Sequence, residues 1–393
     1  MRKLPIALIV LGHTVVDASQ NILPVIIPLL QRQFALSYAQ VGLAVALLTV
    51  SSSLIQPLFG WVSDRWNTQW FLPAGIVWTG ILMGLVGLAP SYLALAAVLT
   101  LTGLGTAAFH PVASMAAAHA SGAQRGLGMS FFSAGGNLGF ALGPILMTWF
   151  LAWFDLRGTL LLTVLSLATA TVIHVYRSEI EVPTRGRSTQ RAADAGPIPR
   201  ARLATLCGLI ALRSWGASGL VIFIPLYLMA DGMPLHLTGR ALFVFLFFGA
   251  LGGMLGGHLS DRVGRQRVIA GSLLSFPALM AAALLMPGTG RWFLLPVAGM
   301  ALLASFSVTV VFAQELLPRR IGLASGLTLG LAFGAGGLGV WMSGMLADLL
   351  GLATSVWILV GLPGIGGMLA LFLRSPQGMP VSRMDRGTPG GPK

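Results

Sequence analysis

Uncharged and mostly apolar runs follow one another along the whole chain, for example Leu72 to Leu88 and Leu352 to Leu373. Runs of about 20 apolar residues can cross a bilayer, where a helix satisfies its own backbone hydrogen bonds. The pattern therefore predicts an all-α membrane protein with twelve transmembrane helices. The expected spans are 5–31, 38–62, 70–89, 92–117, 125–152, 157–177, 203–230, 237–259, 267–287, 292–315, 321–348 and 352–373.

The composition supports this pattern, because 55% of the residues are hydrophobic and only 9% are charged. Soluble proteins carry about 25% charged residues. The chain also contains 51 Gly residues, and small residues let membrane helices approach one another closely. Arg2 and Lys3 precede an apolar stretch, as in a signal peptide, but Asp17, Gln20 and Asn21 interrupt it. We therefore expect a retained first helix.

The positions of the basic residues argue against a nucleic-acid partner in spite of a formal charge of +13. The spans above put nineteen of the 24 Lys and Arg on one side of the membrane. This is the positive-inside pattern, and it predicts an inner (plasma) membrane protein with both termini in the cytoplasm.

An internal repeat divides the chain into two halves. Gly60-Trp-Val-Ser-Asp-Arg65 ends the second span and Gly257-His-Leu-Ser-Asp-Arg262 ends the eighth, 197 residues later. Such a repeat is typical of transporters built from two pseudo-symmetric halves. The expected organisation is an N-terminal six-helix bundle (1–177), a cytoplasmic linker (178–202), a C-terminal six-helix bundle (203–374) and a disordered tail (375–393).

The second copy of this loop, Gly257-x-Leu-Ser-Asp261-Arg262-x-Gly264-Arg265-x-Arg267, resembles the loop signature of the major facilitator superfamily. The first copy keeps Gly60, Asp64 and Arg65 but is degenerate after them. The resemblance implies the major facilitator fold, two bundles related by a pseudo-twofold axis, and transport by alternating access.

Four short patches are similar to the fosmidomycin-resistance group of drug exporters. They are His13-x3-Asp17-x2-Gln20, Phe109-His110-Pro111, Gly135-Gly136-Asn137 and Gln314-Glu315-Leu316-Leu317-Pro318. Drug antiporters often carry Gly-x3-Gly-Pro-x2-Gly-Gly in the fifth span, and here Met147 and Thr148 replace the last two glycines. That departure leaves direction and coupling open.

A polar stripe on the first span carries the main candidate site. His13, Asp17, Gln20 and Asn21 share one helical face, because residues three and four apart are neighbours. A charge at that depth costs at least about 2.5–3.5 kcal/mol on insertion scales, so such residues usually serve a function. We expect Asp17 to carry a coupling proton and its neighbours to contact substrate. The alternative is that Asp17 only bonds an adjacent helix.

Arg213 occupies the corresponding place in the seventh span, 196 residues after Asp17. A twofold axis along the membrane normal would place the two side chains at similar depth across a central cavity. Arginine keeps its proton, and its planar fork suits carboxylate, phosphate or phosphonate. We expect it to hold an anionic substrate or to be the counter-charge of Asp17. A purely structural ion pair is the alternative.

Other spans carry polar or aromatic faces that point to the same cavity. His110 is a second candidate for proton handling, with packing as the alternative. The remaining candidates for substrate contact are Gln56, Thr106, Asn137 and the pair Phe243 and Phe247, which could instead pack or face lipid.

The loop signatures predict gates at the cytoplasmic side. A carboxylate at Asp64 or Asp261 would sit against a helix N-terminus of the other half, and Arg65, Arg262 and Arg265 would bridge to acids or lipid phosphates. The alternative is that these residues only fix the topology.

The sequence contains no Gly-x4-Gly-Lys loop, no Cys/His metal cluster and no catalytic triad pattern, and its single Cys207 permits no internal disulfide. We therefore expect no enzyme activity, no cofactor and no bound metal.

The resulting hypothesis is a monomeric secondary transporter, with a small-molecule substrate, protons and the lipid bilayer as partners. Proton-coupled export of drugs is the main hypothesis, uptake of an organic anion or metabolite is the alternative, and a membrane enzyme or a non-transporting sensor belongs to another class.

Overall fold

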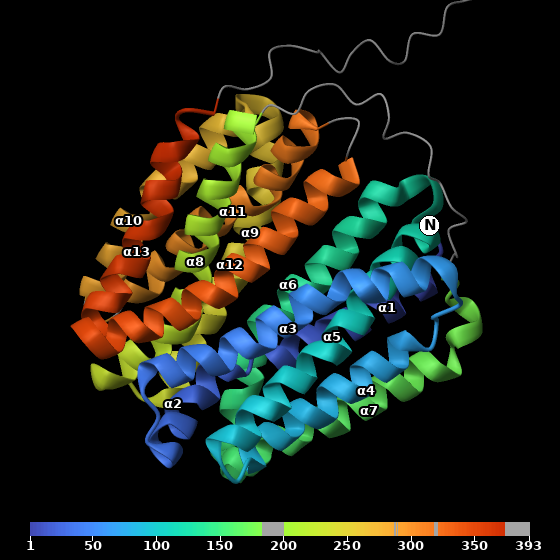
Figure 1. Ribbon diagram of the computed structural model, residues 1–393, viewed down its shortest axis with the longest axis horizontal. Coiled ribbons are helices and arrows are strands. Elements are labelled where there is room, and N and C mark those ends of the chain that lie inside the picture. The colour runs from blue at the N-terminus through green and yellow to red at the C-terminus, as the bar shows by residue number, and fades with distance from the viewer. Residues whose placement is uncertain (183–199, 287, 289, 318–320, 374–393) are drawn as a thin grey trace, which may run out of the picture.

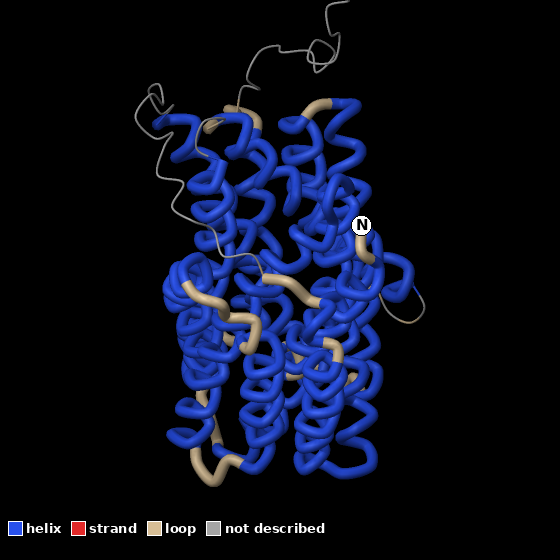
Figure 2. Tube along the Cα trace, turned by 90° about the vertical axis from the view of Figure 1, so that its right-hand side faces the viewer, coloured by secondary structure: helices blue, strands red, loops and turns tan. Residues whose placement is uncertain are grey.

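The fold is helical. The computed structural model describes residues 1–182, 200–286, 288, 290–317 and 321–373, and these residues form helices and short turns without a β-strand (Figure 2). The main helices are α1 (Lys3–Gln20), α2 (Leu23–Phe34), α3 (Tyr38–Arg65), α4 (Phe71–Leu85), α5 (Tyr92–Ser121), α6 (Arg125–Phe154), α7 (Leu160–Val175), α8 (Arg200–Ala230), α9 (Leu235–Val263), α10 (Arg265–Leu285), α11 (Gly290–Leu316), α12 (Ile321–Leu350) and α13 (Leu352–Ala370).

The predicted spans agree with these helices. Among the described residues, 11 helical stretches are long and apolar enough to cross a membrane. One of them, Leu127–Val175, contains most of α6 and all of α7, joined by the short 3₁₀ helix η3 (Asp155–Thr159). The prediction of an all-α membrane protein is confirmed.

The first span differs from its prediction, because it is two helices rather than one. α1 ends at Gln20, and α2 starts at Leu23 after a turn at Asn21 and Ile22. Pro24 stands at the start of α2 and Pro28 lies inside it. Proline has no N–H to donate to the preceding turn, so the helix breaks here. The break lies one turn after Asp17.

The two halves of the chain repeat the same packing. In the first half α1 packs on α6, α3 on α5 and α4 on α7; in the second half α8 packs on α12, α9 on α11 and α10 on α13. Figure 1 shows the first half, coloured blue to green, at the lower right and the second half, coloured yellow-green to red, at the upper left. The sequence repeat therefore corresponds to two bundles of equivalent helices.

The bundles meet along α3 with α12 and α6 with α9. We call the end of the molecule that carries Arg65 and Arg262 the basic end, and the other end the opposite end. At the opposite end a Cβ on Gly344 would lie only 2.1 Å from the Tyr38 carbonyl oxygen, and one on Gly42 would lie 2.6 Å from the Val340 carbonyl oxygen. The two backbones therefore touch there.

A carboxylate reinforces this contact. Asp348 of α12 accepts hydrogen bonds from the backbone N–H groups of Tyr38 (2.8 Å) and Ala39 (2.9 Å), the first residues of α3. The first N–H groups of a helix have no partner within it, and the helix dipole favours an anion at this place. Asp348 thus caps a helix of the other bundle.

Replacing Asp348 by Asn is expected to loosen the opposite end. The loss of a charged acceptor should cost about 1–2 kcal/mol, which shifts the population of the closed state about 5- to 30-fold. Spin labels at the exposed residues Leu93 and Leu349, in a Cys207→Ser background, should report longer distances. Asp155→Asn, the matched change at an acid of the η3 helix, should not alter them, and equal distributions in all variants would contradict the role of the cap.

Charged residues at the basic end hold the N-terminus against the segment that follows α7. The Arg2 guanidinium bridges Glu179 (3.3 Å) and Glu181 (2.9 Å), and His119 lies 2.9 Å from Glu181. Hydrogen bonds from His119 and Arg2 hold the pKa of Glu181 below its ordinary value.

Most of the predicted linker (183–199) and the predicted tail (375–393) lie outside the described residues, so the domain boundaries stay predictions.

Candidate functional site

A buried carboxylate lies between two imidazoles in the first bundle. The Asp17 side chain in α1 is buried, and its Oδ2 lies 3.2 Å from Nε2 of His13, one helical turn earlier. Its Oδ1 lies 3.4 Å from Nε2 of His110 in α5. The predicted proton-handling residues of two different helices are therefore in contact.

The hydrogen bonds of His13 determine where its protons are. Its Nδ1 lies 2.8 Å from the carbonyl oxygen of Phe132 in α6, and a carbonyl oxygen only accepts, so Nδ1 carries a hydrogen. Nε2 therefore faces Asp17 with a lone pair unless the ring is doubly protonated. Two lone pairs repel, so the short contact needs one proton, held by either the imidazole or the carboxyl group. The contact between His13 and Asp17, both in α1, is therefore consistent with one shared proton.

The other side of the carboxylate is less satisfied and more accessible. Asp17 Oδ1 is buried and makes no hydrogen bond with any described residue, although His110 stands within ion-pair distance. The His110 side chain is 21% exposed, against 5% for Asp17 and 10% for His13. His110 is thus the most accessible member of the cluster.

The three ligand atoms of this cluster lie within 4.8 Å of one another. Two imidazoles and a carboxylate at this spacing also suit a transition metal ion. Measurements of proton binding at Asp17 therefore require a chelator in the buffer.

The glycine-rich face of α6 allows α1 to approach this closely. A Cβ on Gly136 would lie 2.5 Å from Cε1 of His13 and 2.8 Å from Oδ2 of Asp17. Two further bonds join the helices: Thr14 donates to the Gly135 carbonyl at 2.9 Å, and Asn21 donates to the Phe140 carbonyl at 2.5 Å. Gly135 and Gly136 of the Gly-Gly-Asn patch therefore pack directly against the face of α1 that carries His13 and Asp17.

Adding one methyl group at Gly136 is expected to disturb the site directly. The new Cβ of Gly136→Ala must displace the His13 ring or the Asp17 carboxylate, at a cost of about 1–3 kcal/mol for overpacking. We expect a lower melting temperature and a fall in transport of at least about tenfold. Gly361→Ala, where an added Cβ meets no atom of the described residues within 4 Å, is the matched control. Equal behaviour of the two variants would show that the close approach at Gly136 is unimportant.

The second bundle holds a buried cation. Arg213 in α8 is 2% exposed, donates to the Ser214 hydroxyl at 3.2 Å, and has its guanidinium carbon 4.9 Å from the centre of the Phe306 ring in α11. Within the described part of the chain its Nε makes no hydrogen bond and no carboxylate lies within ion-pair distance of it. Asp17 contacts His13 and His110 instead. The buried charge is therefore uncompensated.

The other polar residues predicted for the site lie in different environments. Asn21 and Thr106 are buried in the first bundle, where Thr106 also bonds the backbone of its own helix. Gln20 and Gln56 are half-buried, and Asn137 is exposed on α6. Their contact with a substrate stays a prediction.

Phe243 and Phe247 form a stacked pair on α9, with ring centres 5.6 Å apart and planes inclined by 24°. Both are half-buried and pack against the core of the second bundle. Their contact with a substrate also stays a prediction.

The predicted gating residues make contacts within their own bundles. Arg65 lies over the Trp61 ring at 4.0 Å. Arg265 contacts Asp261 at 2.5 Å and Glu315 at 3.1 Å. Arg262 is exposed, and the side chain of Asp64 lies outside the described residues. Bridges from these residues to the other bundle stay a prediction for a state closed at the basic end.

Two features of the site were not recognised from the sequence. Asp348 is a single acid near the end of a span and gave no periodic signal. The carbonyl of Phe132, which orients His13, belongs to the backbone and has no signature. The residue 196 positions before Asp348 is Ala152, so the repeat offers no signal for this acid either.

Comparisons with known proteins agree with this architecture. The sequence matches the family described as Major Facilitator Superfamily over residues 9–337. It is 36% identical over 386 residues to the MFS-type transporter YfnC of Bacillus subtilis, covering 94% of this chain and 93% of that one. It is 34% identical over 379 residues to the fosmidomycin resistance protein of Escherichia coli, covering 92% and 91%.

Solved structures confirm the fold. A bacterial homologue of the human lysosomal transporter Spinster, in an inward-facing and occupied conformation, superposes with a TM-score of 0.80 at 17% identity, covering 94% of this chain and 96% of that one. A point mutant of the nucleoside transporter NupG superposes with a TM-score of 0.75 at 15% identity, covering 95% and 100%. This family and fold are those of a membrane transporter and not of an enzyme. The chain is a multi-pass membrane protein and belongs to the Major Facilitator Superfamily.

Proposed function

We propose that this protein is a secondary active transporter that exports small molecules, fosmidomycin-like antibiotics among them, in exchange for protons. One observation carries the proposal: a carboxylate in the interior of α1, Asp17, is enclosed by two imidazoles that can share its proton. A permanently charged Asp17 would be costly in the membrane interior. Proton coupling requires a group that alternates between its protonated and deprotonated forms, and Asp17 is the candidate for this group.

His110 and His13 have different roles in this proposal. The partly exposed His110 passes the proton between solvent and Asp17, since an imidazole accepts on one nitrogen and donates from the other. His13, fixed to the Phe132 carbonyl, holds the carboxyl group in place. Proton release then leaves Asp17 charged beside two rings.

Arg213 supplies the substrate contact. A buried guanidinium without a carboxylate partner among the described residues is a site for an anionic group, and carboxylate or phosphonate fits its fork in a bidentate manner. Phe306 beside it favours an adjacent flat or apolar portion of the ligand. A cationic group (Arg213) and aromatic rings (Phe306 and the half-buried Phe243 and Phe247) would suit an amphipathic anion, which we propose as the substrate class.

Exchange follows if proton and substrate favour different states of the same two bundles. The bundles touch at the opposite end through Gly344 and Asp348. By the positive-inside rule we expect the basic end and both termini in the cytoplasm, so contact at the opposite end corresponds to a state that loads substrate from the cytoplasmic side. The loop residues Asp64, Arg65, Asp261, Arg262 and Arg265 then close that side when the bundles rock.

The relatives support drug export over other substrates, because one at 34% identity is named a fosmidomycin resistance protein. Uptake of an organic anion by proton symport is the second candidate, and Arg213, which has no carboxylate partner among the described residues, fits it equally well. We place the protein in the bacterial inner membrane as a monomer that needs no nucleic acid. A potential of 100 mV supplies about 2.3 kcal/mol for each charge moved.

The direction of coupled flow distinguishes the two candidates. Purified protein in liposomes should accumulate labelled fosmidomycin when the lumen is acidic, because protons leave as the drug enters. Accumulation only in vesicles with an alkaline lumen would establish symport instead. Protein-free liposomes give the background, and uptake that ignores both gradients would contradict proton coupling.

A further inference from the structure

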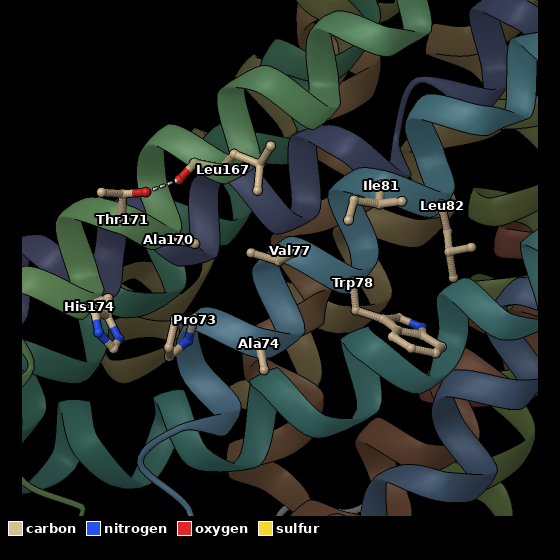
Figure 3. Close-up of a pocket in the computed structure, with 10 residues that line it drawn as sticks. All are labelled: Pro73, Ala74, Val77, Trp78, Ile81, Leu82, Leu167, Ala170, Thr171 and His174. Carbon is tan, nitrogen blue, oxygen red and sulfur yellow. Dashed lines mark hydrogen bonds between the residues drawn. The ribbon is translucent and has the colours of Figure 1, made fainter.

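An apolar groove runs along the outer surface of the first bundle, away from the Asp17 site. It lies between α4 and α7 and has a volume of about 630 Å³. Figure 3 shows its wall, with Pro73, Val77 and Trp78 on one helix and Leu167, Thr171 and His174 on the other. The Thr171 hydroxyl bonds the Leu167 carbonyl of its own helix at 2.8 Å, so the groove surface is apolar.

Local packing explains the groove. Toward the opposite end α4 and α7 are joined by a hydrogen bond from Thr163 to the Gly80 carbonyl at 3.0 Å. Toward the basic end the facing residues are small, Ala74 and Ala170, and the surface is hollow. The Trp78 indole N–H donates to the Leu101 carbonyl of α5 at 2.8 Å. This hydrogen bond fixes the Trp78 ring as one side of the groove.

A second, more polar hollow of about 260 Å³ continues the groove at the basic end and shares Pro73 and His174 with it. Asn67, Gln69 and Arg177 line this hollow. The Gln69 amide donates to the carbonyls of Arg177 and Ile180. These bonds hold the loop before α4 against the segment after α7, so the hollow has a defined shape.

The charge of this polar hollow is positive. Arg177 is exposed, lies 3.5 Å from the His174 ring, and has no ion-pair partner among the residues that the structure describes. The two nearby acids, Glu179 and Glu181, are engaged by Arg2. No carboxylate of the described chain lines either hollow.

We propose that the groove and the hollow bind one anionic phospholipid, with an acyl chain between α4 and α7 and the phosphate at Arg177. The groove extends from Pro73 to Leu82, about 14 Å of helix at about 1.5 Å per residue. This matches half of a hydrocarbon core of about 30 Å. The lipid therefore belongs to the leaflet at the basic end, where the aromatic ring of Trp70 also meets the headgroup region.

Native mass spectrometry of the detergent-purified protein tests the site. We expect adducts of phosphatidylglycerol to be retained over those of phosphatidylcholine with the same chains. Arg177→Gln should lower phosphatidylglycerol retention about fivefold, as expected for one basic residue at a membrane surface. Ala74→Leu, which fills the groove, should lower retention of both lipids. Arg267→Gln, an exposed arginine at the same end, should change neither.

Two results would overturn the proposal. Equal retention of the two lipids, or equal losses in Arg177→Gln and Arg267→Gln, would show only a nonspecific lipid shell. Displacement of phosphatidylglycerol by millimolar inorganic phosphate would show an anion site that does not require an acyl chain. Melting curves of all variants in the same detergent show whether a loss of adducts comes from unfolding.

Discussion

Replacing Asp17 by Asn is expected to abolish proton-coupled transport while the protein still folds and inserts. The amide is similar in size to the carboxyl group and is neutral, so packing against His13, His110 and Gly136 is kept. It does not load and release a proton, and we expect fosmidomycin-driven dissipation of a pH gradient to fall at least about 100-fold, which corresponds to about 2.7 kcal/mol. Proteoliposomes with a pH-sensitive dye in the lumen measure it directly.

A second readout separates lost coupling from lost transport. Counterflow of labelled drug down its own gradient requires substrate binding and rocking but no net proton movement. It should persist in Asp17→Asn. Asp155→Asn, the same chemical change at an acid in the η3 turn, should leave both assays unchanged. Normal coupling in Asp17→Asn would remove this residue from the mechanism.

Replacing Arg213 by Met is expected to stabilise the fold and to abolish transport. The guanidinium is buried and, among the described residues, lacks a carboxylate partner and leaves its Nε without a hydrogen bond. Even a buried ion pair is often stabilised by about 1–4 kcal/mol when apolar side chains of similar volume replace it, and a buried charge without a partner has no ion-pair energy to lose. The melting temperature in detergent should therefore rise, while saturable drug uptake and counterflow both disappear.

The combination of the two measurements is the informative result. Arg240→Met, at an exposed arginine of α9, is the matched control and should show neither change. A destabilised Arg213→Met protein with normal uptake would indicate that the arginine is structural. A destabilised protein without uptake would indicate an anionic partner of Arg213 within the fold, contrary to our assignment.

The fold could be predicted from the sequence because long apolar runs are easy to recognise, and in a membrane such runs have to form helices. Uncharged runs cross the membrane as helices, and the repeat offset of 196–197 residues relates α1 to α8 and α3 to α9. The break between α1 and α2 was missed although Pro24 marks it. Membrane helices tolerate proline when neighbours satisfy the freed groups, so proline alone does not decide between a kink and a break.

The candidate site could be predicted only in part. His13 and Asp17 share a helical face, so their contact follows from spacing. The contact of Asp17 with His110 depends on how α1 and α5 pack, and spacing along one helix carries no information about that. The position of Arg213 within an apolar span indicated that it is buried, as the structure shows, but did not decide which group it contacts. The Asp348 cap depends on where α12 crosses α3, which is again a property of tertiary packing.

The single hydrogen bond from His13 to the Phe132 carbonyl connects chemistry to motion. Phe132 belongs to α6, and α6 is one of the helices through which the first bundle touches the second, on α9. In the proposed mechanism, departure of the proton between His13 and Asp17 forces the His13 ring to turn or shift, and the backbone that the ring bonds belongs to a helix that contacts the other half. In that mechanism proton release and rocking act on the same helix, so that α6, rather than a chain of side chains, transmits the signal.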